Sequence, residues 1–214
     1  MPSEEGPEAV PPEPARRLFF ALWPDEAMRD AMAQATREAA LGSGGRPVPA
    51  ANLHVTLAFL GSVAQRRLAR LREVARAAAL DPAVADPRGR AGPREASSVS
   101  ADRPGEALAL AFDHLEYWRG AQLLCAAPAE SPAWTAALAG RLQARLAESG
   151  FAPDLKSFRP HVTVARKIER PGPVGRMPEV TWRFTELVLV ESRTLPEGPL
   201  YSVAASWPLW AEKR

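Results

Sequence analysis

The sequence His-Val-Thr, followed by an aliphatic residue and alanine, occurs twice in the chain, at residues 54–58 and at residues 161–165. Apart from the histidine and the threonine, both copies are apolar and rich in β-branched residues, which is typical of a buried strand. Each copy follows a segment with helical periodicity and then a loop. A repeated strand in a repeated setting predicts two related halves that each contribute one equivalent strand.

Side chains on a strand alternate between the two faces of the sheet, so residues two positions apart share a face. His54 and Thr56 therefore point one way, while Val55, Leu57 and Phe59 point the other way. The second copy divides in the same manner. Each strand thus has an apolar face for the core and a second face that carries an imidazole and a hydroxyl.

If the halves pack around a twofold axis, His161 and Thr163 meet His54 and Thr56 in one cleft. Such a cleft suits phosphodiester cleavage, because in-line attack needs a base for the water and an acid for the departing oxygen. Histidine titrates near neutral pH, so one imidazole can start neutral and the other protonated. The threonine hydroxyls can donate to the phosphate oxygens. A strained cyclic phosphate needs little further help, so a site without metal is sufficient.

A structural role is the alternative, because a single histidine on a strand is usually a satisfied structural residue. The chain has three histidines, however, and two of them occur in the repeated motif. The third, His114, lacks the matching threonine, which favours a role at the surface or at a strand end. Two histidines could also bind a metal ion, but the motif carries no carboxylate and a third ligand is not apparent.

The order of expected elements is that of an α+β protein and not of a repeated βαβ pattern. We expect Pro24 in the first turn of a helix that stops at Gly42. We expect Ser131 to cap a helix that stops at Gly150. Gly61 is expected to end the first motif strand, and a helix follows it. The expected strands are residues 17–22, 53–60, 107–115, 121–127, 159–166, 180–190 and 200–207.

Two segments lack the pattern of packed structure. Residues 1–15 are rich in proline and glutamate, which predicts a disordered tail. Residues 81–105 are rich in proline, glycine, arginine and serine, which predicts a mobile loop insertion. Together with that insertion, residues 16–214 are expected to form a single domain.

Composition and motif content narrow the cellular compartment and the cofactors to be expected. The net charge of +2 is no nucleic-acid footprint by itself. The single cysteine, Cys125, excludes an internal disulfide, and its apolar neighbours predict a buried thiol and not a nucleophile. We therefore expect a cytoplasmic protein without a signal peptide or a membrane span. Neither a phosphate-binding glycine loop nor a metal-ligand cluster is present, so no cofactor is expected.

At these residues the chain resembles the 2H phosphoesterase superfamily, which is named for its two histidine motifs. More narrowly, it is similar to the bacterial and archaeal RNA 2',3'-cyclic phosphodiesterases, also called LigT-like 2'-5' RNA ligases. The resemblance runs from Arg17 onward. It rests on RLFFALWP (17–24), NLHVTLAFLG (52–61), FRPHVTVAR (158–166) and the ending from residue 189 to residue 201.

The resemblance implies a bilobal α+β fold, in which two pseudo-twofold-related lobes of antiparallel sheet and helices flank an active site in the cleft between them. It implies metal-independent hydrolysis of RNA 2',3'-cyclic phosphate ends to 2'-phosphomonoesters. His54 would be the proton donor and His161 the proton acceptor. Thr56, Thr163 and Arg166 would bind the phosphate. Simple alternation places Arg166 on the face opposite His161, so it can serve only if the strand bends or ends.

The implied partner is RNA with 2',3'-cyclic phosphate ends, such as tRNA fragments, bound by a monomer. The same site could run in reverse and join a cyclic end to a 5'-hydroxyl through a 2'-5' bond. Two alternatives remain open. One is a 2H enzyme for a small cyclic nucleotide such as ADP-ribose cyclic phosphate, and the other is an RNA-end binding module without turnover.

Overall fold

The computed structural model describes residues 13–80, 108–153, 158–169, 172, 174–196 and 198–209. The strands in these ranges are β1 (Ala15–Leu22), β2 (Arg46–Pro47), β3 (Val55–Ala64), β4 (Leu108–Trp118), β5 (Leu123–Ala127), β6 (Val162–Arg166), β7 (Gly175–Phe184), β8 (Glu186–Leu195) and β9 (Gly198–Pro208). The helices are α1 (Glu26–Gly42), α2 (Leu68–Ala79) and α4 (Ala133–Glu148), with short 3-10 turns at η1 (Ala50–Asn52), η2 (Gln65–Arg67) and η3 (Arg119–Ala121). The predicted α+β class is confirmed.

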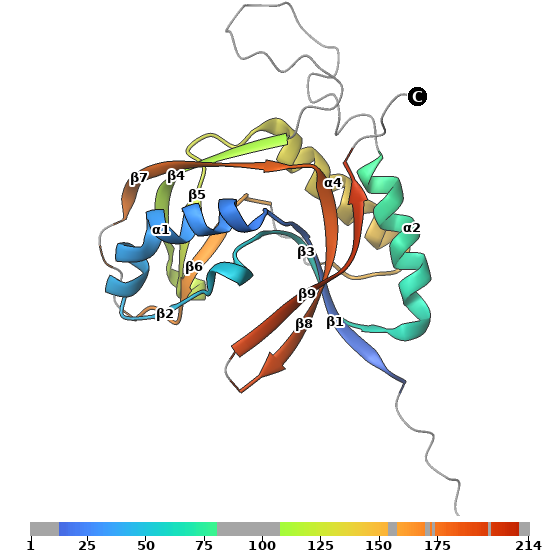
Figure 1. Ribbon diagram of the computed structural model, residues 1–214. Coiled ribbons are helices and arrows are strands. Elements are labelled where there is room, and N and C mark those ends of the chain that lie inside the picture. The colour runs from blue at the N-terminus through green and yellow to red at the C-terminus, as the bar shows by residue number, and fades with distance from the viewer. Residues whose placement is uncertain are drawn as a thin grey trace, which may run out of the picture.

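All of these strands join one sheet, in the order β7-β4-β5-β6-β3-β1-β8-β9, with β2 paired to the end of β6. The order is symmetric about the junction between β6 and β3, which are the two motif strands. In one half β1, α1 and β3 follow one another, and in the other half β5, α4 and β6 do so. The two predicted halves therefore exist, and they share a single antiparallel sheet (Figure 1).

Two of the helices pack against the half of the sheet from which they do not come. α1 leaves β1 but lies along β7 and β6, as Figure 1 shows. α4 leaves β5 but contacts β3 and α2. The indole N–H of Trp182 in β7 donates to the Met28 carbonyl oxygen of α1 at 2.8 Å, which ties the halves together. Through this exchange each half packs against a helix of the other half.

The helices cover one face of the sheet, the face that carries the apolar residues of both motifs. Side chains of α1 line a shared cavity with Leu53 and Val164, and Gln143 of α4 reaches the Leu57 carbonyl oxygen. α2 packs on the same side, where it meets Leu18. No helix in the described part of the chain covers the opposite face, which carries the histidines.

α1 begins two residues later than predicted. Pro24 lies before the helix, and Asp25 occupies the N-cap position. The Asp25 carboxylate accepts a hydrogen bond from the backbone N–H of Met28 at 2.8 Å, which satisfies one of the unpaired donors of the first turn. The predicted stop at Gly42 is confirmed.

Ser131 does not cap α4, contrary to the prediction. Pro132 occupies the N-cap and has no side-chain acceptor, so the Thr135 hydroxyl donates back to the Pro132 carbonyl oxygen at 2.8 Å. The predicted stop at Gly150 is confirmed. Its φ of +73° is the left-handed conformation of a glycine after a helix, and its N–H donates to the Ala147 carbonyl oxygen at 2.9 Å.

Most strand ends differ from the predicted ones by a few residues, and two of the differences bear on the sheet. Gly61 does not end β3, which continues to Ala64. Its φ of +65° instead accompanies a bulge, because Leu60 is left without a partner in β1. The expected single strand at residues 180–190 is divided at Thr185, since β7 pairs with β4 and β8 pairs with β1 at the opposite end of the strand order.

The predicted tail and loop lie mostly outside the described residues. Ala15, at the end of the expected tail, already pairs with Ala64 in the sheet, and the Pro14 carbonyl oxygen accepts from Gln65 N–H at 2.9 Å. Residues 81–105 lie wholly outside the described ranges. The mobile loop insertion therefore stays a prediction.

Trp182→Ala is expected to cost about 3–5 kcal/mol in the free energy of unfolding, because a fully buried indole and its tie to α1 are lost together. Urea denaturation measures the cost. Leu200→Ala is the matched control, since Leu200 is 49% exposed and its truncation should change stability by less than about 0.5 kcal/mol. Equal costs for the two variants would contradict the role of Trp182.

Candidate active site

The two motifs meet at the centre of the sheet, where Val55 of β3 pairs with Val162 of β6. The strands are antiparallel, so the residue before Val55 lies toward the residue after Val162, and the reverse. Continued by one residue in each direction, this register places His54 across from Thr163 and Thr56 across from His161. The charge of a protonated His161 is the smallest of the causes that lower the pKa of His54.

Both imidazoles are held by the same local contact. Nδ1 of His54 lies 2.7 Å from the Asn52 carbonyl oxygen, and Nδ1 of His161 lies 2.8 Å from the Arg159 carbonyl oxygen. A carbonyl oxygen only accepts hydrogen bonds, so Nδ1 must carry the proton in each ring. The lone pair of each neutral ring is then on Nε2, which leaves this nitrogen to exchange a proton with a ligand.

His54 lies in an aromatic enclosure. Its ring stacks on Trp23 at 5.3 Å and meets Phe19 and Tyr201 at 4.9 and 5.4 Å between centroids. The Thr56 hydroxyl lies 3.0 Å from Nε2. Burial, with Arg166 and His161 as smaller causes, lowers the pKa of His54 from 6.5 to about 4, against the opposing effect of the Asn52 carbonyl.

His161 has ionic neighbours. Trp118 lies 4.2 Å from its ring, and the Glu116 carboxylate accepts both from the Trp118 indole at 2.9 Å and from Arg159 at 2.9 and 3.0 Å. Burial lowers the pKa of His161, and Arg159 and Arg166 lower it further, whereas the Arg159 carbonyl and Glu116 oppose them. Both imidazoles therefore favour the neutral form more than a free imidazole does, and the expectation that one of them starts protonated stays a prediction.

Two matching bulges determine which further residues reach this face. Leu57 has no partner in the pairing of β3 with β1, and Val164 has none in the pairing of β6 with β5. Each bulge shifts the alternation by one residue. Arg166 pairs with Leu123 and so returns to the face of Thr163, which meets the condition for its use. Phe59 pairs with Phe19 on the His54 face, so its predicted inward orientation is wrong.

Cys125 lies directly across from Thr163, beneath the site. It is fully buried, as predicted, and burial raises the pKa of its thiol to about 12, so it stays protonated. His114 lies within β4, and its Nδ1 is 2.8 Å from the Asp113 carboxylate. Its hydrogen bond is to Asp113 and not to a motif residue, and it lies partly buried inside its strand, so the predicted place at the surface or a strand end is wrong.

Sequence reasoning missed the neighbours that distinguish the two histidines. Trp23 and Tyr201 lie in segments 17–24 and 189–201, which carry the family resemblance, but neither residue was predicted to lie at the site. Nothing in the sequence placed Glu116 near His161, because Glu116 comes from a strand remote in sequence. Asn52 and Arg159 could have been found, since each precedes its histidine by two residues. The bulges had no sequence signal, because Leu57 and Val164 are ordinary strand residues.

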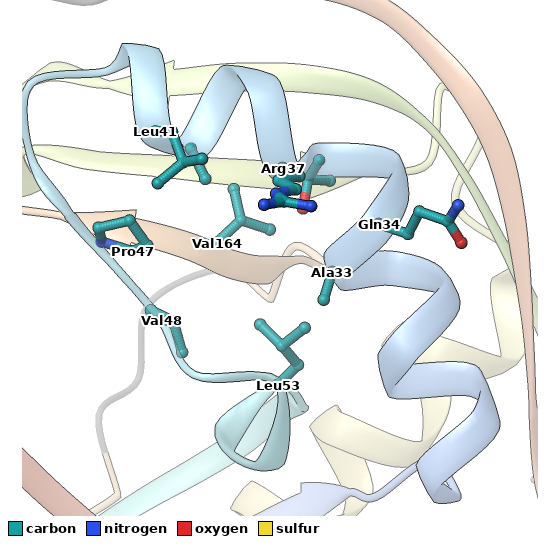
Figure 2. A pocket seen from close by; sticks show the side chains of 10 residues that line it. Ala33, Gln34, Arg37, Leu41, Pro47, Val48, Leu53 and Val164 are labelled. Carbon is teal, nitrogen blue, oxygen red and sulfur yellow. The ribbon is translucent and has the colours of Figure 1, made fainter.

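A cavity of about 500 Å³ lies away from this site, between α1 and the segment that contains β2 and Leu53 (Figure 2). None of the five candidate site residues lines it.

Within the described ranges, no group of three or more histidine, cysteine, aspartate or glutamate residues is arranged to hold a metal ion. No helix in those ranges is long and apolar enough to cross a membrane.

The chain is similar in sequence to two proteins named RNA 2',3'-cyclic phosphodiesterase. The RNA 2',3'-cyclic phosphodiesterase of Thermus thermophilus is 28% identical over 214 residues, which cover 92% of this chain and 91% of that protein. The protein of the same name from Escherichia coli is 26% identical over 199 residues, with coverage of 91% and 97%. Both relatives are thus matched over most of their length.

Solved structures share the fold. A crystal structure of a phosphoesterase superposes with a TM-score of 0.74 at 23% identity, covering 92% of this chain and 100% of that chain. E. coli LigT complexed with 3'-AMP superposes with a TM-score of 0.72 at 22% identity, covering 91% and 98%.

A family model described as "LigT like Phosphoesterase" matches residues 22–85 and 126–201. The matched residues make up more than half of the chain and include both histidine motifs, so the chain belongs to the LigT-like phosphoesterase family of 2H phosphoesterases.

Proposed function

We propose that this protein hydrolyses RNA 2',3'-cyclic phosphate ends to 2'-phosphomonoesters without a metal ion. The observation that carries the proposal is the matched pair of imidazoles, both fixed through Nδ1 at the centre of the sheet. Two curated relatives named RNA 2',3'-cyclic phosphodiesterases support the substrate class. In this proposal His54 is the acid and His161 is the base.

In the proposed reaction, Nε2 of His161 accepts a proton from water while the water oxygen bonds to phosphorus. The bond between phosphorus and O3' breaks, and Nε2 of His54 donates a proton to O3'. The 2' ester bond remains, so the product is a 2'-phosphomonoester. Each turnover adds one proton to His161 and removes one from His54, and exchange with solvent restores both rings.

The different surroundings of the two rings support this division. A base must meet water, and His161 is only half-buried. His54 is 9% exposed within its aromatic enclosure, which suits a donor to a leaving oxygen shielded from water. When His54 is protonated, its Nε2 no longer accepts from Thr56, so the Thr56 hydroxyl is released to donate to the phosphate.

Phosphate binding favours the protonated form of His54, which the free protein disfavours at neutral pH. A bound phosphodiester anion raises the pKa of a nearby imidazole, because it favours the protonated ring. Thr56 and Thr163 donate to the non-bridging oxygens, and Arg166, returned to this face by its bulge, adds a positive charge.

We further propose that the protein acts as a cytoplasmic monomer on RNA ends such as those of tRNA fragments, and that 2'-5' ligation is its minor reverse reaction.

The proposal is tested with an RNA that ends in a 2',3'-cyclic phosphate, in the presence of EDTA. We expect full activity in EDTA and a 2'-phosphate product. His54→Ala and His161→Ala should each lower kcat by about 10²–10⁴-fold, because each removes one proton-transfer group. His114→Ala is the matched control and should retain activity, since His114 bonds to Asp113 instead.

A 3'-phosphate product, or full activity in either motif variant, would contradict this mechanism. Loss of activity in EDTA that returns with added metal would contradict its metal independence. RNA binding without any product would favour the binding module. Turnover of ADP-ribose cyclic phosphate alone would favour the small-nucleotide enzyme.

The pH dependence of kcat/KM reports the pKa values of the free enzyme. The reactive form has His54 protonated and His161 neutral, and burial lowers both pKa values. Above both values the reactive fraction falls about tenfold per pH unit, so kcat/KM should peak below pH 6.5 and decline toward pH 8. The optimum of kcat should lie higher, because the bound phosphate raises the pKa of the donor. A kcat/KM that rises between pH 6 and 8 would contradict His54 as the donor.

A further inference from the structure

Two arginines lie side by side at the end of the second motif strand. β2 runs antiparallel to the end of β6, and this pairing places Arg46 directly across from Arg166. Paired residues of neighbouring strands share a face of the sheet, so Arg46 lies on the face of Thr163. This arginine pair, Arg46 and Arg166, extends the polar row of β6 away from the two histidines.

No carboxylate among the described residues balances the arginine pair. On its other side Arg166 pairs with Leu123, which is apolar. Glu116, a carboxylate on the same face, is already bound by Arg159 and Trp118. Within the described ranges, neither Arg46 nor Arg166 makes an ion pair or a side-chain hydrogen bond.

Like charges directly across a sheet repel each other and destabilise the pairing. The repulsion is removed when an anion binds between or beside the two guanidiniums. A planar guanidinium with several donors matches the oxygens of a phosphate particularly well. The arginine pair, next to a site for one phosphate, therefore has the chemistry of a binding site for a second phosphate.

The backbone holds Arg46 in a fixed place. Val48 N–H donates to the Val164 carbonyl oxygen at 2.8 Å. At Gly45 a Cβ atom would lie 2.5 Å from the Arg166 carbonyl oxygen, so only glycine allows so close an approach of the two strands. Arg46 directly follows this contact, so its backbone is held in place beside the site. Its side chain is exposed.

We propose that Arg46 binds the phosphodiester that joins the terminal nucleotide to the nucleotide before it, while Arg166 faces the cyclic phosphate. This inference rests on the proposed function and narrows its substrate class to single-stranded RNA of at least two nucleotides. A dinucleotide with a cyclic end carries two negative charges, one for each arginine. A mononucleotide with a cyclic phosphate carries one.

Substrate selectivity tests this assignment. The measured quantity is kcat/KM for a dinucleotide with a 2',3'-cyclic end, divided by kcat/KM for the mononucleotide with the same terminal base. Arg46→Ala should lower this ratio about tenfold, because a charge-assisted contact is lost with the dinucleotide. Arg46→Lys, which keeps the charge and loses the planar fork, should lower it less.

Arg76→Ala is the matched control. Arg76 is an exposed arginine in the last turn of α2, on the helix-covered side of the sheet, and its removal should leave the ratio unchanged. The salt dependence gives a second readout. The slope of log kcat/KM against log salt for the dinucleotide should become shallower by about 0.7 in Arg46→Ala, as expected when one phosphate contact to a single strand is lost.

An unchanged ratio and salt slope in Arg46→Ala would overturn the proposal. Failure of the proposed function looks different, because the unaltered protein would then turn over neither substrate. In that case calorimetric binding of a dinucleotide ending in a 2'-phosphate, relative to 2'-AMP, still decides the matter. Arg46→Ala should weaken the dinucleotide selectively, and equal weakening or none would overturn the assignment.

Discussion

One antiparallel contact, between Val55 in β3 and Val162 in β6, determines the arrangement of the site. It joins the two halves of the sheet and turns both motif histidines to the face without helices. Strand register matters here, because a slip of one residue in either motif strand would turn its imidazole toward the apolar core. The exchange of α1 and α4 across the junction, anchored at Trp182, supports this register from the other face.

The halves are similar in backbone and different in chemistry. Both histidines are fixed through Nδ1, and both strands bulge three residues after the histidine. Yet the bulges bring Phe59 to the surface in one half and Arg166 in the other. Aromatic rings enclose His54, whereas His161 adjoins the ion pair of Glu116 and Arg159. A symmetric scaffold with unequal surroundings allows one imidazole to give a proton and the other to take one.

The sequence predicted whatever depends on short-range periodicity. Alternation placed His54, Thr56, His161 and Thr163 on shared faces, and the fold class followed from the order of elements. The bulges were not predictable, because a missing partner is a property of two strands and not of one. Alternation therefore misplaced Phe59 and left Arg166 uncertain. The lowered pKa values of His54 and His161 could not be predicted from the sequence either, because strands remote in sequence bury the two rings.

In the free protein we expect both imidazoles to be neutral and protonated at Nδ1, so that Nε2 of each ring is left for the phosphate site. Nitrogen-15 NMR of the histidine rings at pH 7, without and with 2'-AMP, tests it most directly. We expect the Nδ1–H tautomer for both His54 and His161 in the free protein, and a shift of both Nε2 signals when 2'-AMP binds, while the signals of His114 stay unchanged. An Nε2–H tautomer in either ring, or an Nε2 signal that does not respond to the ligand, would contradict the account.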